Sequence, residues 1–287
     1  MATLDLKHLV VLTLQVSIFC TVFGFGLKLA LEDFLCLVRR PGLFARSLVA
    51  LFVVMPIVAV LLVQLFGLRH VVGVALIAIA ISPVPPLLPR RESNASGAAS
   101  YAMVLMAALA FASIVVVPMS VGVLERLFAR PLEMAPSAVA RIAFVSMVAP
   151  LGAGMLVRAL ASGAAAAIEP VVSRVSQVLL GMGVLALLGG TASAVLALVG
   201  DGTLAAMAVF ILTGLAVGHV LGGADPRQQV VLALSSACRH PAMAVSIAAA
   251  NFPDEQFGPA IILYLLLNIV LCAPYLTWQK RRIGLAV

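Results

Sequence analysis

The stretch Ser235-Ser236-Ala237-Cys238-Arg239-His240-Pro241 separates two apolar runs, Val230–Leu234 and Ala242–Ala250. Proline cannot continue the hydrogen-bond ladder of a helix, and it disfavours helical conformation at the residue before it. The two runs together are long enough to cross a bilayer, so the polar stretch is expected near mid-membrane. A cation at that depth is costly and usually belongs to a functional site. The sequence therefore predicts a broken transmembrane helix around Arg239.

A second break, Ser82–Asn94, lies in a comparable place in the first half of the chain and holds four prolines within seven residues. Two broken segments at corresponding positions of two halves are the best sequence sign of a transporter's binding site. Arg90 and Arg91 fit a cytoplasmic loop whose charges fix topology, whereas Glu92 and Asn94 are better candidates to face a central cavity.

The composition assigns the chain to the membrane. Of its 287 residues, 63% are hydrophobic and 10% are charged, against about a quarter charged in soluble domains. The net charge of +7 comes from Arg and Lys placed mostly in loops between apolar runs, which is a feature of membrane topology and disfavours nucleic-acid binding. Four scattered cysteines without a CxxC pair predict neither a disulfide framework nor a metal site.

Nine crossings are expected, since a spanning helix needs about 20 mostly apolar residues. All loops are short, so one transmembrane domain, 1–287, is expected, made of two related halves at about 8–128 and 137–280. The predicted spans are His8–Leu31, Ala45–Phe66, a broken Val71–Ser96, Gly97–Leu124, Ser137–Leu160, Glu169–Val199, Thr203–Leu221, a broken Gln228–Ala250 and Gln256–Trp278.

The basic residues also predict orientation, because short cytoplasmic loops carry an excess of Lys and Arg. Arg39, Arg40 and Arg46 follow the first expected span, and the triplet at 280–282 follows the last. With nine crossings, both groups are cytoplasmic only if the N-terminus is outside and the C-terminus inside. The bilayer is then expected to be a bacterial inner membrane.

Two interpretations of Arg239 stay open at the level of sequence. The amide end of the half-helix beginning near Pro241, together with the guanidinium, suits a carboxylate, sulfate or phosphate. Alternatively, Arg239 forms a structural ion pair with Glu92. His240 titrates near neutrality and is a candidate proton carrier, or else a hydrogen-bonded structural residue. The residues expected to line the crossing and contact an anion are Arg239, His240, Ser235, Ser236, Cys238, Glu92 and Asn94.

Three segments resemble the bile acid:sodium symporter family and its wider superfamily with the sodium/proton antiporters. They are the loop Arg39–Ser47, the stretch from Pro83 through Ala95-Ser96-Gly97 to Pro118, and Ser235–Ala249 with its small residues beyond the break. The resemblance implies an all-α fold in two inverted repeats. It also implies a panel domain beside a core domain in which two broken helices cross, and organic-anion transport that is usually coupled to sodium.

The sodium ligands of that family are replaced in this sequence. The family's second break typically reads Glu-x-Gly-x-Gln-Asn, with sodium bound by its Glu and Gln, and Ser235 and Arg239 stand at those two places. Leu88 and Pro89 replace a sodium-binding Ser-Asn pair in the first break. Ala102 and Met106 replace Ser and Thr ligands on the next helix. Sodium binding is therefore not expected, and the guanidinium of Arg239 is a candidate replacement for the bound cation.

These residues predict a carrier that moves a small organic anion by alternating access, with coupling to protons or with none. No cofactor is expected. The rival hypothesis is a membrane sensor or degenerate carrier that binds an anion without turnover, which the loss of sodium ligands favours. An intramembrane enzyme is disfavoured, because the sequence contains no HExxH, P-loop or GxSxG motif and no paired intramembrane aspartates.

Overall fold

The described part of the chain is mostly helical. The computed structural model describes residues 6–34, 41–82, 84, 104–105, 107–109, 111–112, 115–116, 119, 141, 144–252 and 254–284, and no strand occurs among them. The elements are α1 (Leu6–Gly26), the 3₁₀ helix η1 (Leu31–Phe34), α3 (Pro41–Val49), the π-helix η2 (Ala50–Val54), α4 (Met55–Phe66), α5 (His70–Ile81), the π-helix η3 (Phe144–Val148), α9 (Ala149–Leu160), α10 (Ser162–Leu196), α11 (Thr203–Leu221), α12 (Pro226–Ala237), α13 (Pro241–Asn251) and α14 (Gly258–Ile283).

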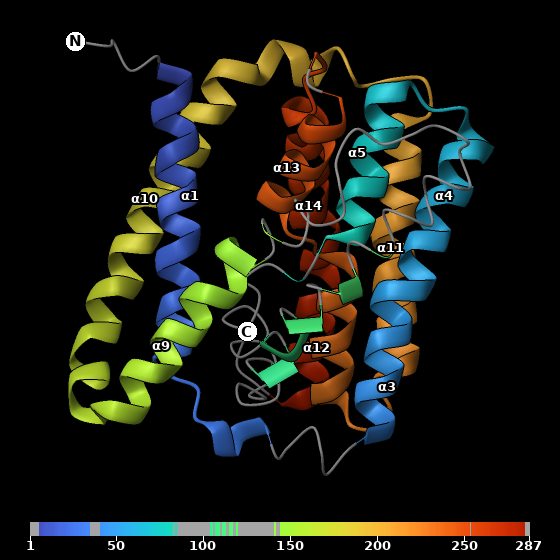
Figure 1. The fold of residues 1–287 in the computed structure, drawn as a ribbon. Helices are drawn as coiled ribbons and strands as arrows, with labels where there is room; N and C mark the ends of the chain where they lie inside the picture. The colour runs from blue at the N-terminus through green and yellow to red at the C-terminus, as the bar shows by residue number, and fades with distance from the viewer. Residues whose placement is uncertain are drawn as a thin grey trace.

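The helices form two groups that lie side by side (Figure 1). Helices α1, α9 and α10 pack on one another in the first group, and α3 to α5 pack with α11 to α14 in the second. The groups meet where α10 contacts α14. A link between them also joins η3 to α13, because the Ser146 hydroxyl lies 3.5 Å from the Met243 sulfur.

Three of the described helical segments are long and apolar enough to cross a membrane: Pro41–Phe66, Thr203–Leu221 and Gly258–Ile283. Shorter apolar helices are Leu12–Gly26, His70–Ile81 and Phe144–Leu160. These segments overlap six of the expected spans, and the chain is an all-helical membrane protein. The count of nine crossings stays a prediction, because most of the expected span Gly97–Leu124 lies outside the described residues.

Several helix boundaries differ from those of the expected spans, among them the start of α10 and the end of α1. Helix α10 begins at Ser162 rather than near Glu169, because the alanines at 164–167 favour helix. The Glu169 carboxylate, inside the helix, forms an ion pair with Lys28 at 2.8 Å. Helix α1 ends at Gly26 rather than at Leu31. The chain tightens there into turns and a 3₁₀ helix, which the Asp33 carboxylate stabilises by accepting from the Ala30 amide at 2.8 Å.

Prolines account for the two π-helices. Pro56 is the second residue of α4, directly after η2, and Pro150 is the second residue of α9, directly after η3. A proline removes one donor from the helical ladder and clashes with the carbonyl four residues earlier. A wider π turn moves the chain past that clash and keeps the helix continuous. Each of these turns also leaves a backbone carbonyl without its usual donor.

Small residues let α11 and α12 pack backbone against backbone. Gly214 and Gly218 lie four residues apart on one face of α11, and Gly222 is the C-cap of the helix. A side chain added at Gly218 would overlap the backbone of Leu232 and Ala233 in α12. Small residues at such spacing are how membrane helices gain packing contacts without a hydrophobic driving force between them. This close approach holds α12, and therefore the break that follows it, against the second helix group.

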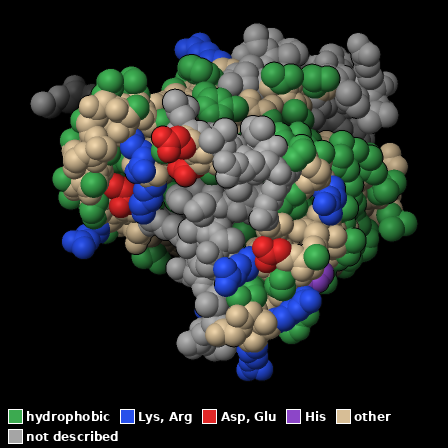
Figure 2. All heavy atoms as spheres, turned by 90° about the horizontal axis from the view of Figure 1, so that it is seen from below, with side chains coloured by type: hydrophobic (Ala, Val, Ile, Leu, Met, Phe, Trp, Pro, Cys, Tyr) green, Lys and Arg blue, Asp and Glu red, His purple; other side chains and the backbone are tan. Residues whose placement is uncertain are grey.

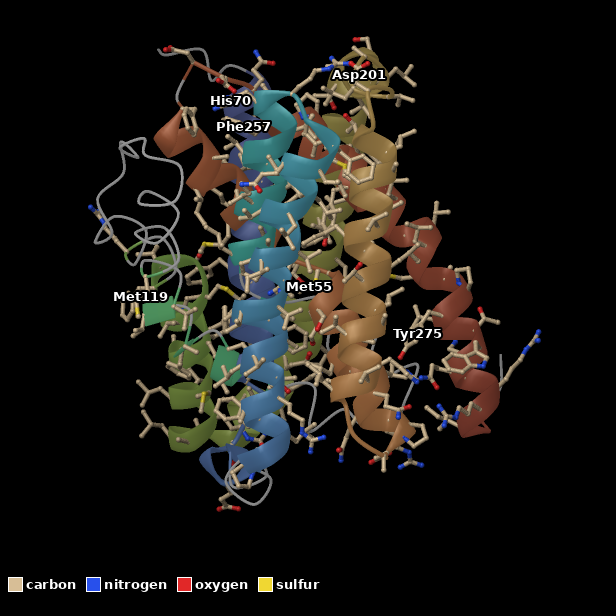
Figure 3. The ribbon with its side chains drawn as sticks, turned by 90° about the vertical axis from the view of Figure 1, so that its right-hand side faces the viewer. Met55, His70, Met119, Asp201, Phe257 and Tyr275 are labelled. Atoms are coloured by element: carbon tan, nitrogen blue, oxygen red, sulfur yellow. The ribbon has the colours of Figure 1, made fainter. Side chains whose placement is uncertain are left out.

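Charged side chains gather at the two ends of the molecule. Figure 2 views one end from below and shows Lys and Arg spread across it, with fewer acidic groups. Arg158, in the last turn of α9, and the basic triplet 280–282, in the last turn of α14, belong to this end. Asp201 and His70 lie at the opposite end (Figure 3), where Arg69 pairs with Asp201 at 2.7 Å. This distribution fits the expected orientation, which stays a prediction.

Replacing Gly218 by alanine is expected to lower the thermal midpoint of the purified protein. The added methyl group would force α11 and α12 apart, and overpacking of this kind typically costs about 1–3 kcal/mol. Gly181 is the matched control, because no described residue lies within 4 Å of a methyl group added there. Thermal unfolding in detergent measures both variants. Equal midpoints for Gly218→Ala and Gly181→Ala would contradict the close packing.

Candidate functional site: the helix break at Arg239

The predicted break in the second half is confirmed. Helix α12 ends at Ala237, residues 238–240 are non-helical, and α13 begins at Pro241. Cys238 and His240 have extended backbones, with φ/ψ of −107°/128° and −76°/106°. The extended His240 follows from Pro241, which disfavours helix at the preceding residue. The break thus has the local cause that the sequence indicated.

Arg239 lies in the interior and binds backbone carbonyls. Its side chain is 1% exposed. One terminal nitrogen, Nη2, donates to the Leu51 carbonyl at 2.7 Å, and the other, Nη1, donates to the Ser82 carbonyl at 3.3 Å. A buried cation is stable only when it is paired or hydrogen-bonded. The guanidinium therefore joins three chain segments, the η2 turn, the end of α5 and the α12–α13 break.

Both carbonyls are available to Arg239 because of nearby prolines. In η2 the Met55 amide donates to the Ala50 carbonyl, so the next π bond, to Leu51, would have to come from residue 56. That residue is Pro56, which has no N–H. Ser82 precedes Pro83, and its extended backbone ends α5. Prolines in two separate segments thus free the acceptors that the arginine takes.

The helix ends around the break favour a positive charge. Helices α5 and α12 both end at this level of the molecule (Figure 1), with their carboxyl ends at Ser82 and Cys238. A helix carries about half a negative charge at its carboxyl end, which stabilises a nearby cation. The dipoles of α5 and α12 therefore offset part of the desolvation cost of Arg239.

Helix α14 closes the carboxyl end of α12. The Ala237 carbonyl accepts from the Tyr264 hydroxyl at 2.5 Å and from the Asn268 amide at 2.8 Å. The Asn268 side-chain oxygen accepts from the Cys238 thiol at 2.9 Å. Interhelical hydrogen bonding is the default role of a polar residue within a membrane helix, and Asn268 has that role here. The sequence indicated no role for Tyr264, because its position in an apolar run carries no signal for one.

His240 caps the second half-helix. Its ring nitrogen Nδ1 accepts from the Met243 amide at 3.3 Å, and its side chain is 1% exposed. One of the amides at the start of α13, where the sequence predicted an anion site, is thus already hydrogen-bonded within the protein. Because Nδ1 accepts, the proton of the neutral ring is on the other nitrogen, Nε2.

Three buried polar atoms at the break have no hydrogen-bond partner among the described residues: Ser236 Oγ, Arg239 Nε and His240 Nε2. Buried polar groups are nearly always paired, so each exception calls for an explanation. All three are able to donate a hydrogen bond, and an anion supplies the acceptors they lack. The break therefore combines a structurally anchored cation with donors that remain available.

Five of the seven expected site residues occur together at this break and are buried: Ser235, Ser236, Cys238, Arg239 and His240. Glu92 and Asn94 lie outside the described residues, so neither their position nor an Arg239–Glu92 ion pair is tested. The Leu51 and Ser82 carbonyls were not anticipated as partners of Arg239. Pro56 and Pro83 were the available signals, because a proline in or beside a helix frees a carbonyl.

Residues 15–198 match the model of the sodium bile acid symporter family. The chain belongs to this family. The matched region begins in α1 and ends just after α10, and therefore does not include the break at Arg239. No curated protein matches the chain. As a member of the family, the protein is a membrane transporter of the sodium bile acid symporter type. It resides in a lipid bilayer and has a small-molecule substrate.

Replacing Arg239 by methionine is expected to destabilise the protein strongly. The Leu51 and Ser82 carbonyls would lose their donor while still buried, and each unsatisfied group costs about 1–3 kcal/mol. Arg239→Lys should be milder, since an ammonium retains the charge and reaches one carbonyl. Thermal unfolding in detergent measures both, with Arg174→Met, at an exposed position on α10, as the control. A midpoint unchanged in Arg239→Met would contradict the anchoring role.

Proposed function

We propose that the protein is a secondary active transporter that moves a small organic anion by alternating access without using sodium. Membership of the symporter family supports transport, and the observation that carries the proposal is the buried guanidinium of Arg239 at the broken helix. The proposed architecture has nine crossings in two inverted repeats, at about 8–128 and 137–280. The group of α1, α9 and α10 would be the panel and the other group the core.

The surroundings of Arg239 support its role as a permanent replacement for a bound cation. Broken-helix transporters bind their coupling cations with unwound carbonyls and the carboxyl ends of half-helices. The guanidinium occupies such surroundings, since it binds the Leu51 carbonyl of a π turn and the Ser82 carbonyl at the end of α5. A covalently attached cation needs no ion gradient to fill the site. Coupling would then be to protons or absent.

The anion would contact donors that have no partner within the described part of the chain. Ser236 Oγ, Arg239 Nε and His240 Nε2 are the nearest candidates, and Ser235, Cys238, Glu92 and Asn94 complete the proposed lining. Arg239 would act on the substrate mainly through its charge, because both of its terminal nitrogens donate to carbonyls. The proposed location is the bacterial inner membrane, with the N-terminus outside and the C-terminus in the cytoplasm.

Uptake into proteoliposomes tests sodium independence. Labelled carboxylates and sulfonates, beginning with a conjugated bile acid, should accumulate equally with sodium or with choline as the external cation. A steep rise of uptake with sodium would contradict the proposal. Saturable binding of an anion without uptake, at pH 6 and at pH 8, would favour the alternative of a non-transporting sensor, for which the loss of the family's sodium ligands is the supporting observation.

Restoring the residue types of the family's second break should restore a need for sodium. The double variant Ser235→Glu/Arg239→Gln replaces the tethered cation by a carboxylate and an amide oxygen, which are ligands that suit a hard cation. Uptake by this variant should fall at least tenfold without sodium and recover when sodium is added. Arg239→Lys retains the charge and should remain sodium-independent. Undiminished sodium-free uptake by the double variant would contradict the replacement.

A further inference from the structure

A groove on the outer surface between α11 and α14 has features of a second binding site. Its volume is about 520 Å³, and its walls are almost entirely apolar. Leu212, Val220 and Leu271 are among the aliphatic residues that line it, and His219, Tyr275 and Trp278 supply its aromatic and polar wall. Tyr275 is near the end of α14 that carries the basic triplet (Figure 3). None of these residues belongs to the break at Arg239.

The polar wall of the groove is a hydrogen-bonded network. The His219 ring nitrogen Nδ1 lies 3.0 Å from the Tyr275 hydroxyl and 3.2 Å from the Gln279 amide nitrogen. An amide nitrogen only donates, so Nδ1 accepts, and the proton of the neutral ring is on Nε2. Nε2 has no partner among the described residues. The Nε2–H of His219, which lines the groove, is thus a hydrogen-bond donor outside this network.

A positively charged side chain, Arg282, borders the same groove. The Arg282 guanidinium lies 5.7 Å from the centre of the Trp278 ring and donates to the Gln229 side-chain oxygen at 3.2 Å. Lys280 and Arg281 precede it in the last turn of α14. Within the described part of the chain, no ion pair joins this triplet to an acidic residue. The end of the groove therefore favours an anion.

The groove is apolar and exposed, as expected of a surface that faces the hydrocarbon of a bilayer. Val220 and Leu212, which line the groove, are 73% and 49% exposed. Exposed large apolar side chains on spanning helices are typical of a lipid-facing surface. Trp278, 49% exposed, and the basic triplet are placed as residues at the membrane interface usually are. A lipid of the surrounding membrane is therefore the candidate occupant of this groove.

We propose that this groove binds an anionic phospholipid. One acyl chain would lie along the apolar walls between α11 and α14. The phosphate would lie beside Arg282, within reach of the His219 Nε2 proton and the Trp278 indole N–H. Charge complementarity selects an anionic over a zwitterionic lipid, because each Lys or Arg near a bilayer surface contributes about 1 kcal/mol of attraction to anionic lipid. The lipid site is independent of the transported substrate.

Thermal unfolding of the purified full-length protein in detergent tests the site with three probes: phosphatidylglycerol, phosphatidylcholine with the same acyl chains, and inorganic phosphate. Phosphatidylglycerol should raise the midpoint in a saturable way, and the other two should not. The variant Arg282→Gln should weaken this apparent affinity by about fivefold, since it removes one charge. Arg46→Gln, which changes an exposed arginine in the last turn of α3, is the matched control and should not change it.

A second variant separates groove binding from general attraction to the basic end. Ala216 lines the groove and is exposed, so Ala216→Trp should fill the groove and abolish the response to phosphatidylglycerol while the lipid-free protein remains folded. Equal stabilisation by phosphatidylcholine, or a response unchanged in Ala216→Trp, would overturn the proposal. A lipid-sensitive dimer whose interface includes Ala216 would also overturn it, because a second copy would then cover the groove. Uptake assays are not needed, so failure here leaves the proposed transport function unaffected.

Discussion

The hydrogen bonds from the Arg239 guanidinium to the Leu51 and Ser82 carbonyls are the interaction on which the second helix group depends. They join the π turn before α4, the end of α5 and the α12–α13 break, which are far apart in the sequence. In lipid an unpaired backbone group costs several kcal/mol, so a broken helix needs such a partner. Arg239 satisfies two freed carbonyls at once, and those carbonyls in turn make the buried charge tolerable.

The rest of the group positions this interaction. The backbone contact of α11 with α12 at Gly214 and Gly218 fixes the half-helix that leads to the break. Tyr264 and Asn268 of α14 hold the Ala237 carbonyl. Two devices thus satisfy backbone groups at the break itself: donors from a neighbouring helix, and the His240 side chain that caps α13. The donors without a partner among the described residues are those that the proposed anion would meet.

The proposed substitution of a tethered charge for a bound ion has a physical basis in this arrangement. Carbonyls and the carboxyl ends of helices offer negative potential to any cation, whether free or attached. An attached guanidinium is planar and always charged, and it directs its donors in fixed directions. Such a group would make the helix crossing independent of an ion gradient. The crossing would then form without first binding sodium.

The sequence by itself determined what depends on local chemistry. Composition assigned the chain to the membrane, Pro241 located the second break, and Pro83 located the end of α5, because proline acts through its immediate neighbours. Five candidate site residues were likewise found from their position in that break. The sequence did not reveal the partners of Arg239, the cap on Ala237 from Tyr264, or the seven extra residues at the start of α10. Only the tertiary structure decided these, since they depend on which distant carbonyls and side chains the packing of helices brings within hydrogen-bond distance.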